Sequence, residues 1–180
     1  MHKDRDSNSN NNQWNIYHAG IGDKYGYFLT NAFTGSAQII PNGTDTIELK
    51  SNLVTSNESG DDFIMYAFHS VEGYSKVGSY VGNGSADGAF IFTGFRPAWV
   101  MFRSSGVGHW IIFYVARKPS NVNNSRIYAN LANDEDSSYS VDFLSNGFKL
   151  RHTGSDFNSS GVTYGYLAFA ESPFKFANAR

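Results

Sequence analysis

The residue types that carry most enzymatic chemistry occur in this chain without the spacings that such chemistry requires. None of its five histidines stands in a His-x-His or His-Glu-x-x-His spacing, the arrangements that hold a metal ion. His18 and His69 fall on predicted strands, where a hydrogen-bonded structural histidine is the commoner role. Cysteine is absent, which excludes disulfides, thiol catalysis and thiolate metal sites.

The acidic segment at residues 134–136 is the place where the sequence could best supply a cation site. Calcium prefers several carboxylate oxygens on a flexible loop, and this segment offers Asp134, Glu135 and Asp136 in succession. No glycine and no spaced Asp or Asn pattern completes a binding cage around them, so we interpret the segment as a solvated loop. A Ca²⁺ site at these three residues is kept as the alternative, and no other cofactor is expected.

Hydrolysis of a glycoside requires two carboxyl groups that face each other across a cleft, about 5–5.5 Å or 6.5–9.5 Å apart. Several carboxylates are candidates, but none has a neighbouring motif that pairs it with another. The glycine-rich segment 82–88 fails as a phosphate loop, because a predicted strand follows it and it contains no lysine. We therefore predict that the protein is not an enzyme. The carboxylates considered are Glu48, Asp87, Asp142 and Glu171.

Aromatic side chains on turns and strand edges are the best candidates for binding, because sugar faces stack on aromatic rings. Trp99 and Trp110 alternate with aliphatic residues and are expected to belong to the core. The polar side chains of the 82–88 loop could bind sugar hydroxyls, although such a segment is also typical of an ordinary turn. The candidate ligand-binding residues are Tyr74, Tyr80, Asn83 and Asp87.

The composition favours a protein made of short strands. Aromatic residues make up 16% and charged residues 17% of the 180 residues, with 18 glycines and 4 prolines. The net charge of −2 provides no electrostatic footprint for nucleic acid or an anionic membrane, and neither is expected as a partner. No run reaches the roughly 18 apolar residues that span a bilayer, and no signal peptide is visible.

Two similar stretches, residues 57–68 and 158–169, organise the predicted elements. Each runs from a polar turn into an apolar strand that ends in Ala-Phe, and Ala168 lies 101 residues after Ala67. This spacing indicates an internal repeat. Both faces of an extended strand over residues 164–169 would be apolar, which predicts a strand buried in the middle of the fold.

Alternating apolar residues and turn signals predict the other strands. Asn146-Gly147 predicts a type I′ hairpin turn, which needs positive φ at both central residues. No stretch has apolar residues at i, i+3, i+4 and i+7 over three turns, so no substantial helix is expected. Strands are expected at residues 14–18, 25–30, 37–40, 46–50, 63–68, 77–81, 89–93, 98–103, 109–116, 141–144 and 148–151, and a strand or helical turn at 126–131.

These elements predict an all-β fold, an antiparallel β-sandwich built from one complete and one partial internal repeat. Residues 1–13 are expected to form a disordered polar tail, 14–72 the partial repeat and 73–180 the complete repeat. The partial repeat lacks a counterpart of residues 73–103, which would leave a sheet edge and apolar faces open. Either the two segments merge into one larger sandwich or a neighbouring chain covers the edge. Of these two, a homo-oligomer is favoured.

Five segments carry a family resemblance: residues 71–76, 78–88, 93–100, 142–149 and 168–180. Their sequences, which include Gly-Ser-Tyr-Val-Gly-Asn-Gly-Ser-Ala-Asp-Gly and Thr-Gly-Phe-Arg-Pro-Ala-Trp-Val, resemble a repeat found in structural proteins of tailed phages, notably marine ones. The resemblance covers nearly everything from Trp14 onward. It implies a concanavalin A-like (laminin-G-like) or jelly-roll-like sandwich. The chain departs from the family pattern in starting part-way through a repeat, without the long upstream fibre region that usually precedes one.

The resemblance implies a function without catalysis, since the family has no catalytic motif to carry over. The expected function is that of a non-enzymatic tail-fibre or appendage module of the virion, which mediates attachment or assembly. Other virion proteins are the expected partners, and a host-surface glycan is the expected ligand class. A capsid decoration (cement) protein, which would bind the capsid lattice and have no glycan affinity, is one alternative. A polysaccharide depolymerase, which would depend on a pair of carboxylates, is the other.

Overall fold

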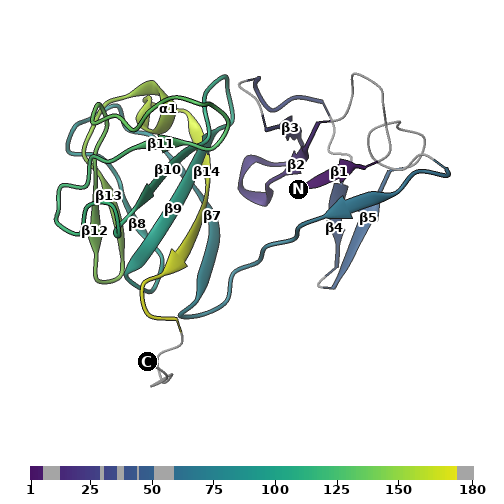
Figure 1. Cartoon of the computed structure of the whole chain (residues 1–180), viewed down its shortest axis with the longest axis horizontal. Coiled ribbons are helices and arrows are strands. Elements are labelled where there is room, and N and C mark those ends of the chain that lie inside the picture. The colour runs from purple at the N-terminus through teal and green to yellow at the C-terminus, as the bar shows by residue number, and fades with distance from the viewer. Residues whose placement is uncertain (6–12, 29–30, 36–38, 44, 51–58, 174–180) are drawn as a thin grey trace.

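The computed structural model describes residues 1–5, 13–28, 31–35, 39–43, 45–50 and 59–173. In these ranges nearly all regular secondary structure is antiparallel β strand, arranged in two units that lie side by side (Figure 1). The described N-terminal unit ends with the strand Phe63–Met65, and the C-terminal unit begins with the strand Ser75–Val81. The prediction of an all-β sandwich fold is confirmed.

The C-terminal unit is a two-layer β-sandwich with a short helical turn at one end (Figure 1). Its elements are β7 (Ser75–Val81), β8 (Phe90–Phe92), β9 (Pro97–Ser104), β10 (Ile111–Tyr114), β11 (Ile127–Tyr128), β12 (Val141–Leu144), β13 (Gly147–Leu150), α1 (Ser155–Asn158) and β14 (Thr163–Ala170). A five-stranded sheet in the order β11-β10-β9-β14-β7 packs against a three-stranded sheet in the order β12-β13-β8.

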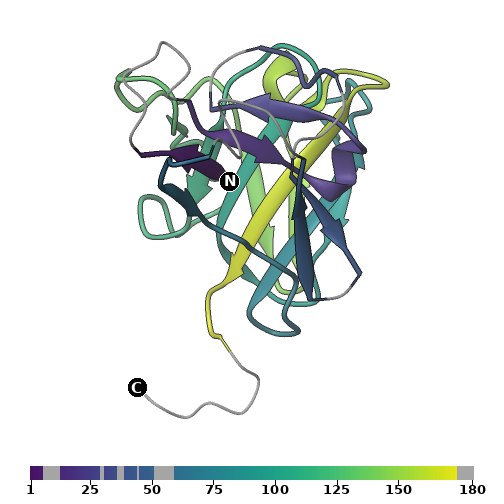
Figure 2. The ribbon, with the colours of Figure 1, turned by 90° about the vertical axis from the view of Figure 1, so that its right-hand side faces the viewer.

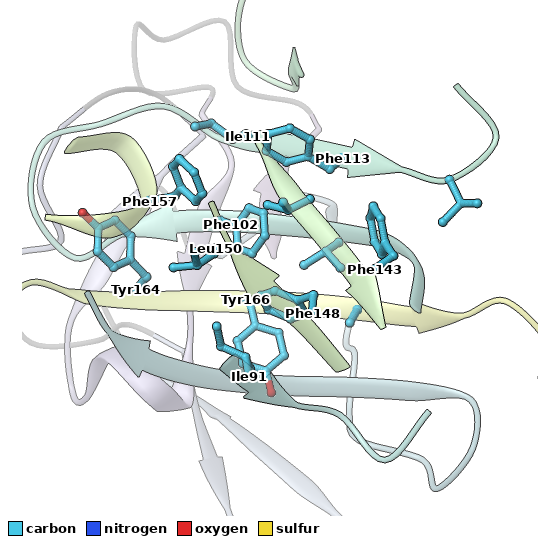
Figure 3. Packing of buried hydrophobic residues seen from close by; sticks show 14 of the residues in the cluster. Ile91, Phe102, Ile111, Phe113, Phe143, Phe148, Leu150, Phe157, Tyr164 and Tyr166 are labelled. Atoms are coloured by element: carbon cyan, nitrogen blue, oxygen red, sulfur yellow. The ribbon is translucent and has the colours of Figure 1, made fainter. Parts of the chain in front are cut away.

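One apolar core fills the space between these two sheets (Figure 3). Alternate residues of β9 and β14 point into it, while the residues between them face the opposite side of the sheet. Each large apolar side chain buried here contributes about 1.5–3 kcal/mol to folding. The best-buried members are Val100, Phe102, Ile111, Phe113, Val141, Phe143, Phe148, Leu150, Phe157, Tyr164, Tyr166 and Ala168.

The N-terminal unit is smaller and consists of one sheet and one hairpin. Its elements are β1 (His2–Asp4), β2 (Asn15–Tyr17), the 3₁₀ turn η1 (Ala19–Ile21), β3 (Tyr25–Tyr27), β4 (Ile39–Asn42), β5 (Thr46–Leu49) and β6 (Phe63–Met65). Four of the strands form a sheet in the order β3-β2-β1-β6, and among the described strands β4 and β5 pair only with each other.

The N-terminal unit packs on the side of the five-stranded sheet that faces away from the three-stranded sheet, so the larger sheet is the middle layer (Figure 1 and Figure 2). Ile16 and Phe33 are buried with Trp110 in a second apolar cluster, and the ring of Phe28 stacks on Trp110 at 5.1 Å. The buried guanidinium of Arg103 donates to the carbonyl oxygen of Asn31 in the N-terminal unit. The prediction that the 164–169 strand is buried on both faces is confirmed for the inner face, whereas on the outer face Leu167 and Phe169 are only half-buried.

Two predictions at the N-terminal end are wrong. Residues 2–4, expected within a disordered tail, form β1, because the backbone of this polar segment pairs with β2 on one side and β6 on the other. Residues 6–12 of the expected tail lie outside the described ranges. The buried strand expected at 63–68 is only the edge strand β6, and the side chains of Tyr66 and Phe68 are each 50% exposed. Among the described strands none covers the outer edge of β6, which explains this exposure.

The hairpin at residues 141–150 forms with a different turn from the one predicted. Leu144 pairs with Gly147, so the two turn residues are Ser145 and Asn146, and Gly147 is the first residue of β13. Gly147 is not among the glycines with positive φ. Its lack of a side chain is required instead by packing, because a Cβ there would lie 2.2 Å from the carbonyl oxygen of Ile91.

Candidate functional site

An apolar groove separates the two units, and we call it the inter-unit groove. Its volume is about 430 Å³, within the range of roughly 300–1,000 Å³ that holds small ligands or docked side chains. Nearly all of its lining is apolar, which suits hydrocarbon or aromatic groups and does not suit a sugar or a charged ligand. The walls include Ile16, Ile39, Ile47, Met65 and Tyr66 from the N-terminal unit and Trp99, Met101, Leu167 and Phe169 from the C-terminal unit.

The alternation of side chains along β14 determines which of its residues line the C-terminal wall of the groove. The residues of β14 that do not enter the main core, Gly165, Leu167 and Phe169, line the groove together with Trp99 and Met101 of β9. Phe169 is the centre of an aromatic cluster, with the rings of Phe68, Tyr74 and Trp99 at 6.3, 5.9 and 5.6 Å. The part of the large sheet's outer face that lines the groove is therefore apolar.

His18 is the one histidine in the groove lining, and its ring is fixed by two hydrogen bonds. Its Nδ1 accepts from the backbone N–H of Gly20 at 3.1 Å, and its Nε2 lies 3.2 Å from the carbonyl oxygen of Tyr166. These partners require a neutral ring that carries its proton on Nε2. Burial lowers the pKa of His18, against the opposing effect of its hydrogen bonds, which also favours the neutral form. His18 thus joins η1 to β14, the structural role predicted for it.

The four predicted ligand-binding residues do not meet in one site. Tyr74 lies at the start of β7 and Asn83 just beyond its end, so about seven residues of extended chain, roughly 20 Å or more, separate them. Tyr80 packs into the main core, where its ring stacks on Tyr164 at 5.3 Å and its hydroxyl donates to the carbonyl oxygen of Phe157 at 2.7 Å. Stacking of Tyr80 on a sugar is therefore corrected to a core role.

Asn83 and Asp87 shape the loop between β7 and β8. The side-chain oxygen of Asn83 accepts from the N–H of Ser85 at 3.0 Å, and its amide nitrogen donates to the carbonyl oxygen of Asp87 at 3.3 Å. The exposed carboxylate of Asp87 pairs with Lys149 at 2.7 Å and Arg151 at 3.1 Å. Both side chains face solvent, so their role in binding a glycan stays a prediction.

The acidic segment 134–136 is not arranged as a calcium cage. Glu135 pairs with Arg117 and Asp136 pairs with Arg126, so these carboxylates are directed at two different arginines. Asp134 is exposed. Across the part of the chain that the structure describes, no three His, Asp or Glu side chains come together as metal ligands would. The geometry favours the solvated-loop interpretation.

The carboxylates considered for hydrolysis are likewise engaged with cations or isolated. Arg151 lies between Asp87 and Asp142 and pairs with both, while Glu171 pairs with Arg96 at 2.8 Å. The bond to Lys149 lowers the pKa of Asp87, which is the opposite of what a general acid needs. Glu48 lies on the separate β4–β5 hairpin.

The inter-unit groove was not predicted from the sequence as a site. The apolar second face of residues 164–169 is the available signal, and by itself it predicts burial and not a groove. Of the two tryptophans predicted to be core, Trp110 is 5% exposed, whereas Trp99 is only partly buried and lines the groove. What the sequence could not reveal is that the N-terminal unit covers this face incompletely.

Comparisons with known proteins identify one family. A family model described as a domain of unknown function, DUF7483, matches residues 3–173. No curated protein and no solved structure matches the chain. In the described residues, no helix is long and apolar enough to cross a membrane.

Proposed function

Because the chain belongs to the DUF7483 family, whose description gives no activity, we propose its function from its architecture and its sequence resemblance. The protein is a non-enzymatic structural module of a tailed-phage virion, of the tail-fibre or appendage type, that mediates attachment or assembly. Its partners are other virion proteins, with further copies of itself among them. A glycan of the host surface is its proposed ligand.

The observation that carries this proposal is the repetition of one sheet arrangement along the chain. The order β3-β2-β1-β6 of the N-terminal sheet has the same chain connections as the order β11-β10-β9-β14 of the C-terminal sheet. Modules repeated in tandem build elongated proteins in which each unit contacts its neighbours. This architecture agrees with the resemblance to repeats of phage structural proteins.

The state of the carboxylates supports a function without catalysis. Asp87 and Asp142 share Arg151 between them, and Glu171 is held by Arg96. A glycosidase needs one carboxyl group that stays protonated near neutral pH and a second that stays ionised. In this structure these carboxylates are paired with basic side chains.

Immunogold labelling of purified particles of the phage that encodes the chain tests the proposal. Label on tail appendages is the expected result. Label distributed over the capsid lattice would support a decoration protein instead, and particles without label would refute a virion protein of either kind. Release of reducing sugars from host polysaccharide, abolished by Asp142→Asn, would overturn the non-enzymatic assignment in favour of a depolymerase.

A further inference from the structure

The N-terminal unit corresponds strand by strand to the C-terminal unit, with two strands fewer. The pair His2–Met65 between β1 and β6 corresponds to Phe102–Tyr166 between β9 and β14. In the hairpins, the pair Ile39–Leu49 corresponds to Val141–Leu150. The complete unit adds β7 to the free edge of β14 and β8 to the free edge of β13. No described strand takes these two places beside β6 and β5.

The backbone of β6 is oriented to accept a strand. Tyr66 N–H donates to the carbonyl oxygen of Met1 and Arg5 N–H to that of Asp62, both at 2.8 Å, so positions 62 and 66 bond toward β1. In an antiparallel ladder the intervening odd positions point the other way. The N–H and C=O groups of Phe63 and Met65 therefore face the outer edge, as those of Tyr164 and Tyr166 face β7.

Beside the outer edge of β6, apolar side chains of the N-terminal unit lack the packing partner that β7 supplies in the C-terminal unit. Ile47 of β5, which corresponds to Phe148, is 42% exposed, whereas Phe148 is fully buried. In the complete unit Tyr80 of β7 packs against Phe148 at 6.5 Å and Tyr166 at 6.3 Å. The counterparts of these two residues, Ile47 and Met65, line the inter-unit groove. The groove thus lies where the inward side chains of a β7-like strand would be placed.

We propose that an extended strand of a partner polypeptide adds antiparallel to β6 and fills the inter-unit groove with its inward side chains. The chemistry of the partner strand follows from β7: apolar residues at alternate positions, and a large aromatic residue opposite Phe63, as Tyr80 is opposite Tyr164. Main-chain hydrogen bonds supply affinity and the groove supplies selectivity, as in other cases of strand addition. The inference does not depend on the virion assignment, because the partner is defined by its strand chemistry alone.

The test uses the full chain and a fluorescein-labelled peptide with the sequence of residues 74–92, which contains the β7 and β8 strands. Anisotropy should show saturable binding. The same peptide N-methylated at Gly78 and Tyr80 loses the two N–H groups that would bond to β6. It should bind about tenfold more weakly or worse, because two main-chain hydrogen bonds to β6 are lost. A peptide with Tyr80→Lys should also lose binding, because the groove is apolar.

Two variants of Met65 locate the binding edge. Met65→Pro removes an N–H that points to the outer edge of β6 and leaves the bonds to β1 in place, which proline tolerates at a sheet edge. Met65→Leu keeps the N–H and a similar apolar volume. Peptide binding should be lost in Met65→Pro and retained in Met65→Leu. If Met65→Pro does not fold, as judged by circular dichroism, the test is the comparison of the methylated and unmethylated peptides on the unmodified chain.

Three results would overturn the proposal. Equal binding of the methylated and unmethylated peptides would mean that no strand ladder forms. Equal binding by Met65→Pro and the unmodified chain would place the peptide elsewhere. A peptide-free dimer in sedimentation that Met65→Pro abolishes and that does not bind the peptide would show that the edge is closed by contact between two N-terminal units and not by an added β7-like strand.

Discussion

Arg126 is a buried cation held between two aromatic rings. Its guanidinium lies 4.6 Å from the ring of Tyr128 and 3.9 Å from that of Tyr139, and it forms an ion pair with Asp136. Planar stacking and forked hydrogen bonding are properties of arginine that lysine does not share. Arg117 offers a comparison, because it pairs with Glu135 at the surface and its guanidinium lies 5.6 Å from a single ring, that of Tyr114, instead of between two.

Arg126→Lys should lower the free energy of unfolding by about 1–3 kcal/mol, because the charge stays buried while both ring contacts weaken. Urea denaturation followed by fluorescence measures this change. Arg117→Lys, the matched control, should leave the urea midpoint essentially unchanged. An equal effect of the two substitutions would show that the aromatic enclosure of Arg126 adds nothing.

His18 gives the stability of the protein a defined pH dependence. Burial lowers its pKa in the folded state below the value near 6.5 of an unfolded chain, so the unfolded state binds the proton first as the pH falls. The free energy of unfolding should therefore decrease as the pH drops below about 6.5. In urea titrations between pH 7.5 and 5.5, His18→Gln should show a shallower decrease, with His2, whose pKa burial also lowers, supplying part of the remainder. Identical slopes for the two proteins would contradict this assignment.

At the scale of elements, the close approach of β8 to β13 determines what residue 147 can be. A Cβ at Gly147 would lie 2.2 Å from the carbonyl oxygen of Ile91 and 2.9 Å from the ring of Phe90. The clash involves backbone, so a rotamer change cannot relieve it. Only a shift of a whole strand would make room.

Gly147→Ala should destabilise the protein by about 1–3 kcal/mol, the usual range for overpacking. Gly106→Ala is the control, because a Cβ there would meet only the Ser104 hydroxyl at 3.5 Å. Thermal unfolding of both variants measures the difference. If Gly147→Ala is as stable as the unmodified chain, the two strands are not as close as described.

Sequence patterns located strands well where burial is decided by side chains, and poorly where backbone pairing decides. The apolar alternation in β9, β10 and β14 predicted those strands and the central position of β14 in the fold. The polar β1 could not be predicted, because its place depends on ladders with β2 and β6. The need for glycine at position 147 and the core position of Tyr80 both depend on contacts with residues distant in sequence. The inter-unit groove depends on the packing of whole units, which no local pattern encodes.

At the scale of the whole molecule, the C-terminal unit has a complete core of its own, and the N-terminal unit covers part of its outer face. Removing the first 72 residues would uncover Trp99, Met101, Leu167 and Phe169 while leaving the core between the two sheets intact. This difference between a self-contained unit and a dependent one can be measured.

A chain of residues 73–180 should fold cooperatively, with at least about twofold more binding of the dye ANS than the full chain, because a contiguous apolar patch becomes exposed. Circular dichroism and dye fluorescence at equal protein concentration give the comparison. A truncated chain without a cooperative transition would show that the two units fold only together.

The pairing of β7 with β14 also determines how the C-terminal unit would respond to force. Ser75, where the chain enters β7, lies opposite Phe169, where it leaves β14. Tension applied through the two ends of this unit would therefore pull apart one end of the ladder and open it pair by pair, instead of shearing all its bonds at once. In single-molecule pulling, this unit should yield at a lower force when held by these two ends than when held by residues 75 and 163, which lie at opposite ends of the ladder. A module tethered in this way would act as an extensible link that lengthens under load.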